Sequence, residues 1–107
     1  MINTYKSYGT ILGTTAATSI YSVSGTTTGI VNSVTLSNAS NASTTATLSV
    51  VKAGITYSLI TNGYIPTSTT LQVLDAPIIL ETGNSLYAMS KGATGAIHVF
   101  VSVLEIT

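Results

Sequence analysis

Few residues in this chain have side chains that could carry out chemistry. They are one histidine, His98, three carboxylates, Asp75, Glu81 and Glu105, and three lysines. His98 and Asp75 could supply two members of a Ser/His/Asp triad, but the chain has no GxSxG sequence of the kind that exposes a nucleophilic serine. Because His98 alternates with apolar residues in a strand-like segment, we predict a packed or interface histidine and not a catalytic base.

The carboxylates Asp75 and Glu81 are a pair that could in principle act as acid and base in a glycosidase. Asp75 precedes Ala76-Pro77 at a predicted turn, where an Asp side chain can bond its own backbone, and Glu81 ends a predicted strand. The clustered ligands that zinc or calcium requires are missing. We therefore expect no enzymatic activity, with no catalytic residue, no cofactor and no metal.

Two glycine-rich segments resemble phosphate-binding loops, Gly25-Thr-Thr-Thr-Gly29 and Gly92-Ala-Thr-Gly95. In the second, Lys91 precedes its glycine, and no helix-forming segment follows either loop, so we predict turns. Six tyrosines could form a sugar-stacking or receptor patch, although rings at a sheet rim or a subunit contact are the more frequent use. They are Tyr5, Tyr8, Tyr21, Tyr57, Tyr64 and Tyr87.

The triplet Asn-Ala-Ser occurs twice in succession, beginning at Asn38 and at Asn41. As a motif it is a tandem glycan acceptor, and as backbone chemistry it is the small, polar tip of a hairpin. The N-terminal sequence MINTYKSYGTIL lacks the basic and apolar regions of a signal peptide, so we expect no export by the usual route and unmodified triplets. We predict a hairpin with its connection at 39–43.

The elements that must position these residues are strands. Charged residues make up only 6% of the 107 residues, and 20 Thr and 14 Ser supply a neutral polar surface that suits β-structure. Net charge is zero and no basic patch is present, so we expect no nucleic-acid binding; near-zero charge also favours association. No run of about 20 apolar residues exists, so we expect no membrane span.

Alternation of apolar and polar residues predicts short strands separated by turn residues. In Gly29–Asn38, Ile30, Val34 and Leu36 fall on one face with Asn32 as the exception, and Asn62-Gly63 is expected to close the strand that starts at Ile55. The other predicted strands are Ser19–Val23, Thr44–Lys52, Thr69–Leu74, Ile78–Glu81, Ser85–Ser90 and Ala96–Ile106. This pattern indicates an all-β fold, a single antiparallel β-sandwich or jelly-roll-like domain of about eight strands spanning residues 1–107.

The last predicted strand, Ala96–Ile106, is apolar on both faces. Its second face is covered either by the same chain, as in a central strand, or by a neighbouring subunit. Residues 1–10 have weaker periodicity and form either an N-terminal arm that adds to a neighbour's sheet or a first edge strand. We predict subunit contacts through Tyr5 and Tyr8 of this segment and through Phe100, Val101 and Leu104 of the last strand.

The C-terminal half resembles a known group of proteins. The run IPTSTTLQVLDAPIILETGNSLYAMSKGATGAIHVFVSVLEI, residues 65–106, is similar to the small β-sandwich virion proteins of tailed bacteriophages, especially marine phages and cyanophages. In that group a strand of the form TLxVLDxPIxLExGDxLxV precedes a small-residue loop and a final strand ending near VSxLEI. Asn84 stands where Asp is usual. The resemblance covers roughly residues 19–106 and implies a role in the particle shell or tail, without catalytic residues.

From the residues and the resemblance together we predict a bacteriophage virion structural protein. The expected role is a capsid decoration or cement protein that stabilises the head through protein–protein contacts. The alternatives are a tail, fibre or adaptor component, or a carbohydrate-binding host-recognition module. The expected partners are the major capsid protein or other virion proteins, with the chain as a homo-oligomer, a trimer being one option. The expected location is the virion, assembled in the cytoplasm of the host bacterium.

Overall fold

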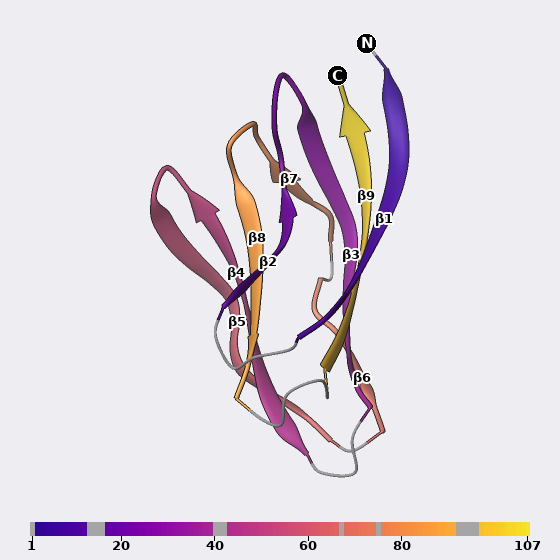
Figure 1. Cartoon of the computed structure of the whole chain (residues 1–107), viewed down its shortest axis with the longest axis vertical. Coiled ribbons are helices and arrows are strands. Elements are labelled where there is room, and N and C mark those ends of the chain that lie inside the picture. The colour runs from indigo at the N-terminus through magenta and orange to yellow at the C-terminus, as the bar shows by residue number, and fades with distance from the viewer. Residues whose placement is uncertain (1, 13–16, 40–42, 67, 75, 92–96) are drawn as a thin grey trace.

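The computed structural model describes residues 2–12, 17–39, 43–66, 68–74, 76–91 and 97–107, and these form nine strands (Figure 1). The strands are β1 (Asn3–Ile11), β2 (Thr18–Ser22), β3 (Thr28–Asn38), β4 (Thr44–Lys52), β5 (Ile55–Ile65), β6 (Thr70–Gln72), β7 (Ile78–Leu80), β8 (Ser85–Ser90) and β9 (Ile97–Ile106). Among the described residues, no helix is long and apolar enough to cross a membrane.

The strands form two antiparallel sheets that pack face to face. Sheet A has the order β1-β9-β3-β6, with β7 also paired to β3, and sheet B has the order β2-β8-β4-β5. The molecule measures 45 × 26 × 23 Å, and both chain ends lie at the same end of the sandwich (Figure 1). The predicted all-β sandwich is confirmed. Residues 3–11 form an edge strand of the same chain's sheet, so the arm-like segment pairs within its own domain.

The core lies between the sheets and is built from the alternate residues that face inward. In β9 these are Ile97, Val99, Val101 and Val103, all at most 2% exposed. Sheet B contributes Leu48 and Leu86, among others. Burying each such side chain contributes roughly 1.5–3 kcal/mol to folding. The alternation predicted for the last strand and for Thr44–Lys52 is therefore the pattern that forms the core.

A bulge at Asn32 corrects the predicted face of β3. The pairing of β3 with β9 shifts register between Val31 and Ser33, so one extra residue is accommodated there. Since a one-residue shift moves every later side chain to the opposite face, Val31 and Val34 are both buried and Ile30 lies on the outer side. The prediction that Ile30 shares a face with Val34 was wrong. Asn32, which breaks the alternation in the sequence, lies at the bulge that separates the two residues.

The predicted hairpin between β3 and β4 is also corrected. Both strands exist with nearly the predicted bounds, but β3 pairs with β9, β6 and β7 in sheet A, whereas β4 pairs with β8 and β5 in sheet B. The connection therefore crosses from one sheet to the other. The hairpin that does form joins β4 and β5 through Ala53 and Gly54, whose positive φ angles of 53° and 78° suit a tight two-residue turn.

Gly63 does not close a strand as predicted, because β5 continues through it to Ile65. A Cβ atom at Gly63 would lie 2.5 Å from Cδ1 of Ile60 and 3.3 Å from a methyl group of Leu71. The glycine therefore leaves room for the side chains of Ile60 in the same strand and of Leu71 in the other sheet. The register of β5 against β4 shifts on both sides of Leu48, so this edge strand is irregular in its middle.

Asn84, which stands where Asp is usual in the phage proteins that this segment resembles, lies in a turn held by backbone hydrogen bonds. The Asn84 N–H donates to the Glu81 carbonyl at 3.0 Å, and the Asn84 carbonyl accepts from the Val23 N–H at 3.0 Å. Gly83 adopts φ of 90° and donates its N–H to the Val23 carbonyl. These bonds use main-chain atoms, so they form with either Asn or Asp at residue 84.

Candidate interaction surface

The outer face of sheet A carries a row of large apolar side chains that are exposed or half-buried. Register places Tyr5 beside Leu104, Leu104 beside Ile30, and Ile30 beside Ile79, so one row crosses β1, β9, β3 and β7. We call these four residues the apolar row. Its two ends are the most open, with Tyr5 78% and Ile79 66% exposed. A surface of this kind is typical of a contact surface.

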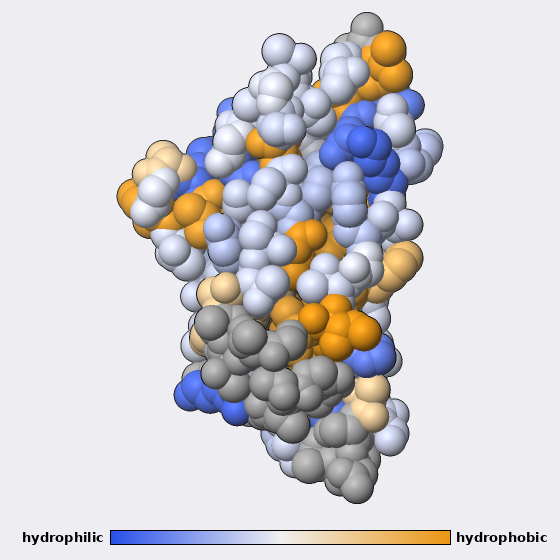
Figure 2. Space-filling view, in the orientation of Figure 1, coloured by the Kyte–Doolittle hydropathy of each residue, from blue (hydrophilic) through white to orange (hydrophobic). Residues whose placement is uncertain are grey.

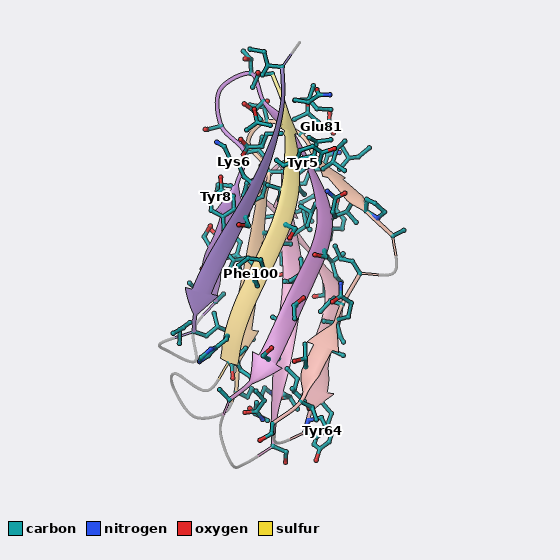
Figure 3. All side chains as sticks on the ribbon, turned by 90° about the vertical axis from the view of Figure 1, so that its right-hand side faces the viewer. Tyr5, Lys6, Tyr8, Tyr64, Glu81 and Phe100 are labelled. Carbon is teal, nitrogen blue, oxygen red and sulfur yellow. The ribbon has the colours of Figure 1, made fainter. Side chains whose placement is uncertain are left out.

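A hollow lies on the same face, further along β1 and β9. We call it the Phe100 hollow; its volume is about 360 Å³, and it is lined by Gly9, Thr10, Ile11, Ser37, His98, Val99 and Phe100. Phe100 is 51% exposed and lies on the outer face of β9, beside the glycine of β1 (Figure 3). The hollow exists because Gly9 has no side chain at the position that faces Phe100.

Three of the five predicted interface residues lie together on this outer face: Tyr5, Leu104 and Phe100. Val101 does not, because its side chain is 1% exposed and points into the core, so its prediction as a contact residue was wrong. Tyr8 also faces inward, where its ring lies 5.4 Å from the ring of Tyr21 and packs against the core. The strict alternation of strand side chains explains the separation of these five.

His98 is exposed at one end of the outer face, between Ile11 of β1 and Ser37 of β3. The Ser37 hydroxyl is hydrogen-bonded to the Thr70 hydroxyl at 3.0 Å. Asp75 lies outside the described residues, and so does the segment Gly92–Gly95. The expectations that His98 and Asp75 form no triad, that Asp75 and Glu81 form no glycosidase pair, and that the second glycine-rich segment is a turn therefore stay predictions. Gly25 has φ of 67° at a turn, as predicted for the first loop.

The opposite face of the same sheet holds a charged cluster that the sequence analysis did not find. Glu105 accepts a hydrogen bond from the Tyr21 hydroxyl at 2.7 Å and forms an ion pair with Lys6 at 3.0 Å. Its side chain is only 14% exposed. A Cβ atom at Gly29 would lie 2.6 Å from the Tyr21 oxygen, so glycine there makes room for the phenol. We call Glu105, Tyr21 and Lys6 the Glu105 cluster.

The Glu105 cluster changes the proton affinity of its members. The hydrogen bond from Tyr21, followed by that from Lys6, holds the pKa of Glu105 below its ordinary value. Burial first, and then the bond to Glu105, raise the pKa of the Tyr21 phenol well above its usual range. The carboxylate is thus kept charged and the phenol protonated. One signal was present in the sequence, since Glu105 continues the inward-facing series of odd residues in β9.

The remaining carboxylate that the structure describes forms a simpler pair. Glu81 contacts Nζ of Lys52 at 2.8 Å, and both side chains are more than half exposed. The hydrogen bond to Lys52 lowers the pKa of Glu81. Such exposed pairs contribute little to stability because water screens them. This agrees with the prediction that Glu81 has a place at the end of a strand.

The tyrosines do not gather into one patch. Tyr5 is on the outer face of sheet A, Tyr8 and Tyr21 lie between the sheets, and Tyr64 is at the opposite end of the molecule from Tyr5 (Figure 3). Tyr57 and Tyr64 belong to the edge strand β5, and Tyr87 belongs to β8. The sugar-stacking patch suggested by their number therefore has no single location.

Asn38, the first glycan-acceptor candidate, is buried in the fold. Its side chain is 2% exposed and donates a hydrogen bond from Nδ2 to the Ile65 carbonyl at 3.1 Å. This amide ties the end of β3 in sheet A to the end of β5 in sheet B. Asn41 lies outside the described residues. Asn38 thus serves packing at the end of β3 and does not lie at an exposed hairpin tip.

Comparison with known proteins finds likeness of fold only. No family model and no curated protein matches the sequence. Among solved structures, a chain of infectious bursal disease virus strain Gx is similar over 94% of this chain, with 12% identity and a TM-score of 0.49. A chain of strain Gt is similar over 99%, with 12% identity and a TM-score of 0.44. This chain spans 31% of the length of each. What the geometry itself provides is a rigid β-sandwich with an apolar outer sheet face.

Proposed function

We propose that this protein is a structural component of a bacteriophage particle, a capsid decoration or cement protein that stabilises the head through protein–protein contacts. The observation that carries the proposal is the uncovered outer face of sheet A. Tyr5, Leu104 and Phe100 lie there on strands whose other sides are fixed by the core, so the contact surface is rigid before assembly. A preorganised surface loses little conformational entropy when it binds.

The rest of the surface also suits repeated contact in a symmetric shell. With three Lys+Arg and three Asp+Glu in 107 residues, copies repel one another little. Figure 2 shows a face that is mostly pale, as expected for Thr and Ser, with apolar patches between. The similarity of residues 65–106 to virion proteins of tailed phages supports the same role, and an enzymatic function has no support from the residues of the outer face.

The proposal is tested by locating the chain in purified particles. We expect density for the sandwich on the head lattice, with the outer face of sheet A against a neighbouring subunit. Particles that lack the chain should release their genome at a lower temperature than complete particles. Density on the tail or fibres would replace the head role with the tail role, and absence of the chain from particles would refute both.

A carbohydrate-binding role is the second candidate, favoured by the Phe100 hollow. An exposed aromatic ring beside the hydroxyl of Ser37 and the imidazole of His98 is a combination that sugar-binding sites use. A glycan array with the assembled protein separates the two proposals. Binding that is lost in Phe100→Ala would support the carbohydrate role, whereas an array without binding would count against it. Any turnover abolished by His98→Ala would contradict both roles.

A further inference from the structure

The free edge of β1 has a regular set of unpaired backbone groups. Ile2 and Thr107 exchange two backbone hydrogen bonds, and the Leu12 N–H donates to the Ile97 carbonyl. Because the register between these ends is uninterrupted, the N–H and C=O groups of the even-numbered residues of β1 point toward β9. The odd-numbered residues therefore point their N–H and C=O groups away from the sheet. These residues are Asn3, Tyr5, Ser7, Gly9 and Ile11. In the part of the chain that the structure describes, no strand pairs with this edge.

The other sheet edges are protected in ways that β1 is not. The β5 edge is interrupted by register shifts, β2 has five residues and a shift, and β6 and β7 have three residues each. Short or bulged edges resist pairing with other chains. β1 has nine residues, no proline and no shift, and its one charge, Lys6, is paired with Glu105 at 3.0 Å. It is the edge that is best suited to accept another strand.

We propose that two copies of this chain pair antiparallel through β1, about a two-fold axis at Ser7, and join their A sheets into one continuous sheet. In an antiparallel pair, odd-numbered residues must oppose odd-numbered residues, so the axis passes through a residue and not between two residues. An axis at Ser7 pairs all five odd-numbered residues, an axis at an even-numbered residue pairs at most four, and an axis at Tyr5 or Gly9 pairs only three. The occupant is therefore a second copy, because the edge is complementary to itself.

The side chains fit the same register. With the axis at Ser7, Tyr5 lies opposite the partner's Gly9, so the most exposed ring of β1 meets the only residue of that strand without a side chain. Gly9 borders the Phe100 hollow, and a Cβ atom there would be 3.7 Å from the ring of Phe100. The partner's Tyr5 thus fills the hollow against Phe100. Lys6 lies opposite the partner's Tyr8, so the two Lys6 side chains do not face each other.

This pairing concerns the protein in solution and does not depend on the virion role. The chain has no cysteine, so single-cysteine variants report unambiguously. In Ser7→Cys the two thiols sit on the axis, where the Cα atoms of a hydrogen-bonded pair are about 5.5 Å apart, within the range for a disulfide. The matched control is Ser102→Cys, which lies beside Ser7 on the same face, one strand further in. In the proposed dimer the Cα atoms of the two cysteines at residue 102 would be roughly 14 Å apart, too far to form a disulfide.

We expect mild oxidation to convert Ser7→Cys into a covalent dimer while Ser102→Cys stays largely uncoupled. In sedimentation equilibrium, Tyr5→Ala should raise the dissociation constant at least about tenfold. Tyr64→Ala, which removes another largely exposed ring at the other end of the molecule, should leave it unchanged. Equal coupling of the two cysteine variants, or a wild-type protein that stays monomeric at all concentrations, would overturn the pairing. Neither result bears on the location of the chain in particles.

Discussion

The two faces of sheet A share one backbone and differ in what covers them. On the inner face, Val99, Val101 and Val103 are buried in the core, and the Glu105 cluster lies at one end of it. On the outer face, Phe100 of the same strand is 51% exposed and Leu104 is half-buried, and their neighbours are residues of the adjacent strands of the same sheet. The inner residues of β9 therefore account for folding. The outer residues contribute less to the fold than their apolar character suggests and are available for contacts.

The largest expected effect comes from placing one charge on each face of β9. Val101→Asp buries a carboxylate without a partner, which should cost at least about 3 kcal/mol and leave little folded protein. Phe100→Asp, the next residue and the same substitution, should fold and lose association. Chemical denaturation measures the first effect and sedimentation the second. Equal loss of stability in the two variants would break the distinction between the faces.

The two described carboxylates, Glu105 and Glu81, differ in burial and should differ in their contribution to stability. Glu105→Gln weakens a hydrogen bond from buried Tyr21 and removes the partner of Lys6, so we expect a loss of about 1–2 kcal/mol in the free energy of unfolding. Glu81→Gln disrupts an exposed pair and should leave stability unchanged within error. If urea denaturation shows the reverse order, the Glu105 cluster is not the stabilising one.

The Glu105 cluster also predicts an acid dependence with a definite sign. The folded protein lowers the pKa of Glu105, so its contribution to stability is complete above the ordinary carboxyl value of about 4.3 and is lost as pH falls through the folded value. Urea denaturation between pH 2 and pH 7 should therefore show a smaller acid loss in Glu105→Gln than in the wild type. An unchanged acid profile in this variant would contradict the assignment.

An alkaline dependence of smaller size follows from Tyr21. The fold raises the pKa of this phenol, so its contribution is complete below the ordinary value of about 10 and is lost as pH rises above it. Lys6, whose pKa is raised by Glu105, acts in the same direction. Thermal denaturation between pH 8 and pH 11 should show a shallower decline in Tyr21→Phe than in the wild type, and an identical decline would argue against this role of Tyr21.

Local patterns predicted most strands but not their partners. Alternation was sufficient for β4 and β8, whose bounds match the prediction, because each has one buried face. It failed at Asn32 and at Gly63, where a bulge and close packing between sheets act against the local pattern. Alternation also could not assign β3 and β4 to different sheets. That assignment depends on pairing with strands distant in the sequence, β9 beside β3 and β8 beside β4.

The candidate surface was predictable to a similar extent. Tyr5, Leu104 and Phe100 could be named from the apolar character of both faces of the last strand, but Val101 and Tyr8 point the other way because side chains alternate. The Glu105 cluster brings together residues 84 apart in the chain, Tyr21 and Glu105, and no local spacing indicates such a contact. The pairing edge required the register of β1 against β9, which only the fold supplies.

Residue-resolved amide hydrogen exchange of β1 shows whether a second copy of the chain pairs with its free edge. The even residues Thr4, Lys6, Tyr8 and Thr10 bond to β9 and should be protected at every protein concentration. The odd residues Tyr5, Ser7 and Gly9 should exchange freely in dilute protein and become protected as concentration rises, because only a second copy satisfies their N–H groups. Odd-residue amides that stay unprotected in concentrated protein would contradict the claim that this edge and the outer face beside it are an assembly surface.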